Sequence, residues 1–133
     1  HTCRSCRRSV VLVISRRFKA ALTKHQFLNP AYSMKPSLIP SNFDFQECIP
    51  LWTLDETKTA IYREFVFVDF QQAFRFMTLS AQYAEEIDHH PDWSNSWNKV
   101  MVNLSTHSAG ALTRLDIQLA KAMDAFASQV KQS

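Results

Sequence analysis

The sequence predicts an α+β domain in which a four-stranded antiparallel sheet carries about three helices on one face, in the order α-ββ-α-ββ-α. Three observations predict it. Residues 59–68 are rich in aromatic and β-branched side chains, and residues 99–106 alternate apolar and polar ones, as strands do. Residues 69–87 and 113–130 repeat apolar side chains at helical spacing. A shorter strand-like segment precedes each of the two strands, which indicates two hairpins.

The first helix and the first hairpin are predicted between Pro40 and Val68. Prolines at 36, 40 and 50 restrict any helix in this stretch to a short one between Pro40 and Pro50. Residues 52–54 are expected to pair with residues 59–68 through a turn at residues 55–58. One face of this strand consists of Ile61, Arg63, Phe65 and Phe67, and the other consists of Tyr62, Glu64 and Val66.

The second helix is predicted from about Asp69, its N-cap, to Ile87, before the break at Pro91. Its apolar stripe is expected to consist of Phe70, Ala73, Phe74, Met77, Ala81 and Ala84. Phe76, Leu79 and Tyr83 lie partly off that stripe. Two interpretations stay open: a second partner such as another copy of the chain, or a wide stripe that faces only the core.

The second hairpin is expected within residues 93–106, and the last helix within residues 113–130. Thr113 as N-cap with Asp116 three residues later resembles a capping box. The apolar stripe of this helix is expected to be Leu112, Leu115, Leu119, Met123 and Phe126, and it would face Val100, Val102 and Leu104 of the second hairpin. A four-stranded sheet leaves open edges, which pairing in a dimer would cover.

Composition excludes several functions. The chain has one glycine, so it contains neither a Gly-rich phosphate loop nor a dinucleotide fingerprint. Residues 1–33 hold seven basic and no acidic residues, whereas residues 34–133 hold eight basic and twelve acidic ones, a net charge of −4. The basic charge therefore belongs to the N-terminal stretch, and we expect no direct nucleic-acid binding. No apolar run is long enough to span a membrane.

Residues 1–33 form a basic extension that precedes the domain at residues 34–133. Its Arg-rich, acid-free composition is typical of a mitochondrial transit peptide. The alternative is upstream sequence without a cellular role, with Met34 as the start. We therefore expect a cytoplasmic and also nuclear protein, or a mitochondrial one if the extension is a genuine transit peptide.

The residues suited to chemistry gather in two stretches, 85–93 and 105–110. His89, His90 and His107 lie there, and histidine exchanges protons near neutral pH. Two histidines beside a carboxylate, with a third elsewhere, suit acid–base work on a polar ring. Composition alone also allows ordinary loop histidines. A zinc site is disfavoured because adjacent histidines rarely both reach one ion.

These stretches are similar to the pterin-4a-carbinolamine dehydratase family, closest to its animal form. The resemblance is carried by residues 88–93, 97–100, 104–107 and 112–113, with Asp116, and it covers about residues 52–130. It implies dehydration of 4a-hydroxytetrahydrobiopterin to quinonoid dihydrobiopterin, with no metal or organic cofactor. It also implies a homodimer or homotetramer, and in some animal members binding to a homeodomain transcription factor.

The resemblance further implies roles for single residues. His89 and His107 would be the acid–base groups, and His90 would mainly bind the pterin. Glu85 would orient His89 from one helical turn back, and Asp116 would support the pocket. The remaining residues that would line the substrate site are Asp88, Trp93, Ser105, Thr106 and Ser108.

Overall fold

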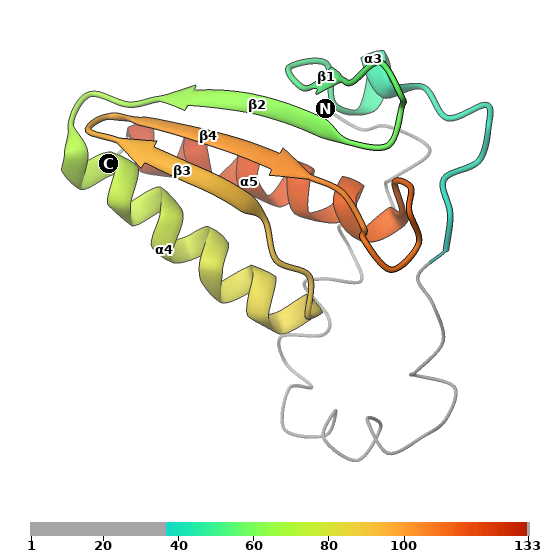
Figure 1. The fold of residues 1–133 in the computed structure, drawn as a ribbon. Coiled ribbons are helices and arrows are strands. Elements are labelled where there is room, and N and C mark those ends of the chain that lie inside the picture. Colours follow the sequence, from blue (N-terminus) through green and yellow to red (C-terminus); the bar gives the residue numbers. More distant parts are fainter. Residues whose placement is uncertain (1–36, 133) are drawn as a thin grey trace.

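The computed structural model describes residues 37–132, which form a four-stranded sheet and three helices (Figure 1). The predicted interpretations of residues 1–33 lie outside these described residues. The predicted order of elements is confirmed. In chain order the elements are α3 (Phe45–Cys48), β1 (Thr53–Leu54), β2 (Ile61–Val66), α4 (Phe70–Ile87), β3 (Asp92–Ser96), β4 (Lys99–Leu104) and α5 (Arg114–Gln132).

The sheet is antiparallel throughout, with strand order β1-β2-β4-β3. Both predicted hairpins form, and β2 and β4 join them at the centre of the sheet. The register places Ile61 opposite Leu104 and Phe65 opposite Val100, and all four side chains are buried. Since side chains alternate between the two faces of a strand, this register gathers the apolar residues of both strands on the face that α4 and α5 cover.

Helix α4 begins and ends as its flanking residues predict. The carboxylate of Asp69 accepts a hydrogen bond from the backbone N–H of Gln72 at 2.9 Å. At the other end Asp88 adopts a left-handed conformation with φ 53° and ψ 46°. Aspartate tolerates this conformation better than most residues do, so the helix ends at Ile87, four residues before Pro91.

The predicted buried face of α4 is only partly confirmed, because Ala73 and Ala84 are buried and Met77 is half-buried, but the two phenylalanines of the stripe are exposed. Phe70 and Phe74 are 46% and 56% exposed and stack on each other, whereas Phe76 and Tyr83 are buried in the core. Both sides of this helix carry apolar residues at helical spacing, so periodicity alone does not identify the side that packs on the sheet. The residues of α4 that are buried are Ala73, Phe76, Ser80, Tyr83 and Ala84.

Helix α5 packs against α4 beneath the sheet (Figure 1). Its predicted stripe is largely confirmed, because Leu112, Leu119 and Met123 are buried while Leu115 and Phe126 are half-buried. One half of the predicted capping box forms: the backbone N–H of Thr113 donates to the carboxylate of Asp116 at 2.9 Å. The hydroxyl of Thr113 takes a different partner, which bears on the candidate site described below.

Short helix α3 lies between Pro40 and Pro50, as expected, and is capped by Asp44. The segment that follows it is held to α5. The indole N–H of Trp52 donates to Asp124 at 2.8 Å, and the guanidinium of Arg63 on β2 contacts the same carboxylate oxygen. These two hydrogen bonds join the β1 side of the sheet to the middle of α5.

Candidate active site

The turn after α4 separates two adjacent histidines. The backbone N–H of Asp88 and that of His89 both bond to the carbonyl of Ala84, so the chain folds back sharply at Asp88. This reversal turns His89 inward, where it is 8% exposed, and leaves His90 exposed. The two residues therefore occupy different environments although they are neighbours in the sequence.

The ring of His89 is held by a buried carboxylate on another helix. Its Nε2 lies 2.6 Å from Oδ1 of Asp116, which is fully buried in the first turn of α5. The other carboxylate oxygen, Oδ2, accepts the hydroxyl of Thr106 at 2.7 Å and the backbone N–H of Thr113 at 2.9 Å. Thr106 and Thr113 both donate to Asp116, and with the ring of His89 they fix the carboxylate in place.

The loop between β4 and α5 places the third histidine. Backbone N–H groups of Ala109 and Gly110 bond to the carbonyl of Thr106, and a bridge pairs Thr106 with Ala111. This tight turn needs the left-handed conformation of Gly110, with φ 62°. His107 lies exposed in the turn, directly after the buried Thr106. The lone glycine of the chain thus shapes the loop that presents His107.

A second histidine–carboxylate pair lies at the surface. Nε2 of His90 is 2.9 Å from Oε2 of Glu85, and their side chains are 55% and 78% exposed. Glu85 therefore bonds to His90 rather than to His89, contrary to the role that the resemblance implies. Solvent screens such a pair strongly, so it orients His90 while adding little to stability.

The other predicted site residues differ in how far they are exposed. Asp88 and Ser108 are exposed, and Ser105 is half-buried. Thr106 is buried, and its hydroxyl is used within the network around Asp116. Trp93 is half-buried, pairs with Val102 in β4 and packs against the core. Its ring therefore contributes to the core under the sheet.

Sequence reasoning missed one member of the network. Thr113 was predicted only as a helix cap, but its hydroxyl lies 2.8 Å from the hydroxyl of Thr106 and both groups are buried. The spacing of Thr113 to Asp116 indicates the bond between the Thr113 backbone N–H and the carboxylate. It gives no signal for the contact of the Thr113 hydroxyl with Thr106.

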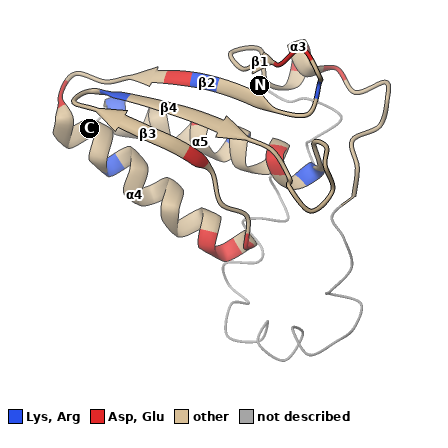
Figure 2. Cartoon of the chain, in the orientation of Figure 1, with Lys and Arg blue, Asp and Glu red and all other residues tan. Residues whose placement is uncertain are grey.

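Charge at the site is predominantly negative on the α4 side. Figure 2 shows acidic residues at the C-terminal end of α4, where Glu85, Glu86 and Asp88 follow one another closely and are all exposed. Carboxylates only accept hydrogen bonds, so this end suits a ligand that presents N–H groups. Within residues 37–132, no three His, Cys, Asp or Glu side chains are arranged to hold a metal ion.

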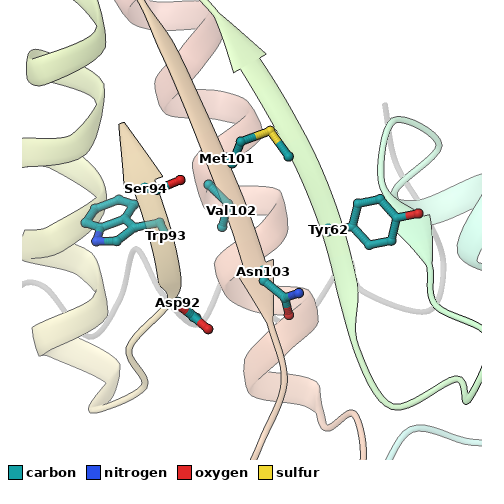
Figure 3. Close-up of a pocket in the computed structure, with 7 residues that line it drawn as sticks. All are labelled: Tyr62, Asp92, Trp93, Ser94, Met101, Val102 and Asn103. Carbon is teal, nitrogen blue, oxygen red and sulfur yellow. The ribbon is translucent and has the colours of Figure 1, made fainter. Parts of the chain in front are cut away.

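A shallow open depression lies elsewhere, over strands β2, β3 and β4 (Figure 3). None of the three histidines lines it, and Met101 and Tyr62 stand exposed at its sides. We therefore place the candidate site at the histidines, where buried hydrogen bonds fix the groups. The residues that line the depression are Tyr62, Asp92, Trp93, Ser94, Met101, Val102 and Asn103.

Fold and site together define a class of protein: a small α+β domain with a histidine–carboxylate site where the end of α4 meets the start of α5. Comparison with known proteins makes the class specific. A family model described as pterin 4 alpha carbinolamine dehydratase matches residues 41–126. The chain belongs to the pterin-4a-carbinolamine dehydratase family.

Individual relatives agree with this assignment. The pterin-4-alpha-carbinolamine dehydratase of Drosophila melanogaster is 50% identical over 80 residues, which are 60% of this chain and 42% of that protein. A protein of Rhizorhabdus wittichii that carries the dehydratase name provisionally is 45% identical over 71% of this chain and 98% of its own length. A solved structure from Brucella melitensis, described as a transcriptional coactivator/pterin dehydratase, has a TM-score of 0.62 at 40% identity, covering 68% of this chain and 99% of that one.

Proposed function

We propose that this protein dehydrates 4a-hydroxytetrahydrobiopterin, the pterin-4a-carbinolamine, to quinonoid dihydrobiopterin in the recycling of tetrahydrobiopterin. The observation that carries the proposal is the buried bond between His89 and Asp116 in a member of this family. A histidine oriented by a carboxylate is the arrangement that general acid–base catalysis uses. Dehydration of a carbinolamine needs only such proton transfers.

Each histidine has a role that its position supports. The reaction breaks the bond from C4a to its hydroxyl, which leaves as water after it gains a proton, and it removes a proton from N5. We assign these two proton transfers to His89 and His107, which adjoin the Asp116 network from α4 and from the β4–α5 loop. His90, exposed and paired with Glu85, would bind the pterin ring.

Other polar groups would complete the substrate site. Three of them lie beside the histidines in the sequence: Asp88, Ser105 and Ser108. Asp88 and Ser108 are exposed and Ser105 is half-buried, so all three are open to contact with a bound ring. Asp116 and Thr106 would act behind His89, because both are buried and bonded to one another. Trp93 would support the site through the core rather than by stacking on the substrate.

Spectroscopic measurement of carbinolamine dehydration tests the proposal. We expect the full chain to accelerate the reaction well above its spontaneous rate and His89→Ala to lose most of that acceleration. Removal of one general acid–base group typically costs 10²- to 10⁴-fold. Glu64→Gln, which alters an exposed carboxylate on β2, is the control and should keep the wild-type rate. A wild-type rate equal to the spontaneous one would refute the proposal.

The exposed aromatic pair Phe70–Phe74 supports a second function, binding to a homeodomain transcription factor. The Brucella protein, similar to this chain, is described as a transcriptional coactivator. We had expected such a surface from Phe76, Leu79 and Tyr83, but Phe76 and Tyr83 are buried, so Phe70 and Phe74 take their place. Binding that survives His89→Ala and is lost in Phe74→Ser would support this function, and equal binding by both variants would contradict it.

We also propose a homodimer or homotetramer, since the aromatic face of α4 and the edge strand β3 are both exposed. For location we propose the cytoplasm and the nucleus, or mitochondria if residues 1–33 direct the protein there. Within residues 37–132, none of the helices could cross a membrane. Light scattering tests the mass, and imaging of the full chain against residues 34–133 tests the role of the extension.

A further inference from the structure

The hydrogen bonds around Asp116 determine where the protons of the network lie. Oδ2 of Asp116 is approached by the backbone N–H of Thr113, which can only donate, and by the hydroxyl of Thr106. Two donors on one oxygen stabilise the ionised carboxylate, which accepts hydrogen bonds and has no proton to give. The group on its other oxygen must then also be a donor.

The two buried hydroxyls therefore form a chain with one direction. Thr106 has a single hydroxyl proton, and it points at Oδ2 of Asp116 from 2.7 Å. The 2.8 Å contact between the hydroxyls of Thr106 and Thr113 must then use the proton of Thr113. The hydroxyl of Thr113 donates to the hydroxyl of Thr106, which in turn donates to Asp116. The carboxylate thus accepts two hydrogen bonds from this pair of threonines, one from the Thr106 hydroxyl and one from the Thr113 backbone N–H.

The same balance of hydrogen-bond donors and acceptors at Asp116 determines the tautomer of His89. At 2.6 Å from a carboxylate oxygen, a bare Nε2 would set two lone pairs against each other, so Nε2 carries a hydrogen. Nδ1 has no hydrogen-bond partner among residues 37–132. The buried side-chain atoms without a partner in this part of the chain are Ser80 Oγ and Tyr83 Oη, so Nδ1 of His89 is accessible to solvent. Of the two ring nitrogens, Nδ1 is the one left to exchange a proton.

We propose that Nδ1 of His89 is the atom that takes and gives the proton, and that Thr106 is a positioning residue whose hydroxyl, together with the backbone N–H of Thr113, enforces this tautomer through Asp116. The inference deepens the proposed function and rests on it for the identity of the substrate. The tautomer itself is a property of the free protein and does not depend on any substrate.

Replacing Asp116 with asparagine inverts the expected tautomer. The two donors at the Oδ2 position select the amide oxygen of the new side chain, so its NH₂ group faces Nε2 of His89. An NH₂ group can only donate, so Nε2 must accept and the ring proton moves to Nδ1. The exchanging nitrogen then presents a hydrogen where the wild-type ring presents a lone pair.

Nitrogen-15 NMR of the histidine side chains in the labelled full chain tests this assignment. The two ring nitrogens differ in their couplings to the ring carbon-bound hydrogens, and the protonated one is identified by its shift. At a pH where the ring is neutral, we expect a hydrogen on Nε2 of His89 in the wild type and on Nδ1 in Asp116→Asn. His89→Gln assigns the signals. A hydrogen on Nδ1 in the wild type would overturn the proposal.

The threonines are tested in the same spectra. Thr113→Val removes the hydroxyl but keeps the backbone N–H, and Thr106→Val removes the hydroxyl that reaches Asp116. We expect Thr106→Val, which has lost one of the two donors to Oδ2, to show some of the Nδ1–H tautomer, and Thr106→Ser to restore the Nε2–H form. Thr113→Val keeps both donors and is the matched control that should stay in the Nε2–H form. A single Nε2–H tautomer in Thr106→Val would show that its hydroxyl is not a positioning group.

Activity separates this inference from the proposed function. If the protein dehydrates the carbinolamine, Asp116→Asn should lower the rate at least about 100-fold, as expected when a catalytic histidine is held in the wrong tautomer. Thr106→Val should lower the rate more moderately, Thr113→Val should keep most of it, and Glu64→Gln, at an exposed carboxylate on β2, is the surface control. Absence of activity in the wild type with the predicted tautomers would refute the proposed function alone. Full activity of Asp116→Asn with an inverted tautomer would refute the role of Nδ1.

Discussion

Nε2 of His89 and Oδ1 of Asp116 lie 2.6 Å apart, although 27 positions separate them in the sequence. Their hydrogen bond joins the end of α4 to the first turn of α5, and both side chains are buried. The groups that would carry the chemistry are thus part of the interior where these two helix ends meet. The proposed chemistry and the stability of the fold would therefore depend on the same carboxylate.

We predict that Asp116→Ala destabilises the protein by about 3–5 kcal/mol, because it leaves His89, Thr106 and the Thr113 N–H buried without their partner. Urea unfolding followed by circular dichroism measures the change. Glu86→Ala removes an exposed carboxylate and should stay within about 0.5 kcal/mol of the wild type. Equal stabilities of the two variants would contradict a structural role for Asp116.

Much of this domain could be predicted from residues 52–130. Aromatic and β-branched residues in 59–68 and alternation in 99–106 indicate the central strands, and Asp69 and Pro91 indicate the limits of α4. The buried face of α4 could not be predicted, because Phe74 and Phe76 both fit helical spacing and only the sheet decides between them. The partner of Glu85 was also beyond the sequence, because the turn at Asp88 decides which histidine points outward.

The surface pair Glu85–His90 should behave differently from the buried one. Both side chains are more than half exposed, so we expect Glu85→Gln to change the free energy of unfolding by less than about 0.5 kcal/mol. The same change should weaken substrate binding if His90 holds the pterin, because the ring loses its oriented partner. Steady-state kinetics should show a higher KM with little change in kcat. A large loss of kcat at constant KM would instead place His90 among the proton-transfer groups.

Phe74 and Phe76 form a matched pair for the two faces of α4. Phe76 is fully buried and packs against Phe65 and Phe67, so Phe76→Ala should cost about 3–5 kcal/mol of stability. Phe74 is 56% exposed, so Phe74→Ala should cost far less in an isolated chain. Light scattering of Phe74→Ser at matched concentration then tests the oligomer. An unchanged mass would show that this face does not join copies of the chain.

The buried carboxylate of Asp124 predicts a pH dependence of stability. Burial raises the pKa of Asp124 above its ordinary value of 3.8, and it outweighs the hydrogen bond from Trp52 and the charge of Arg63, which lower that pKa. In the pH range just above 3.8, the folded protein therefore binds more protons at this site than the unfolded chain does. The contribution of Asp124 to the free energy of unfolding must fall as the pH rises through this range.

Asp124→Asn isolates that contribution, because the amide oxygen can still accept from Trp52 and Arg63 but the side chain no longer titrates. Denaturant unfolding of both proteins from pH 3.5 to 7 gives the difference in their free energies of unfolding, in which the other carboxylates cancel. We expect the stability of the wild type relative to Asp124→Asn to decrease with rising pH and then level off above the raised pKa. An increase with pH would mean that the charge of Arg63 outweighs burial, since only a lowered pKa makes an ionising carboxylate more stabilising as protons are removed.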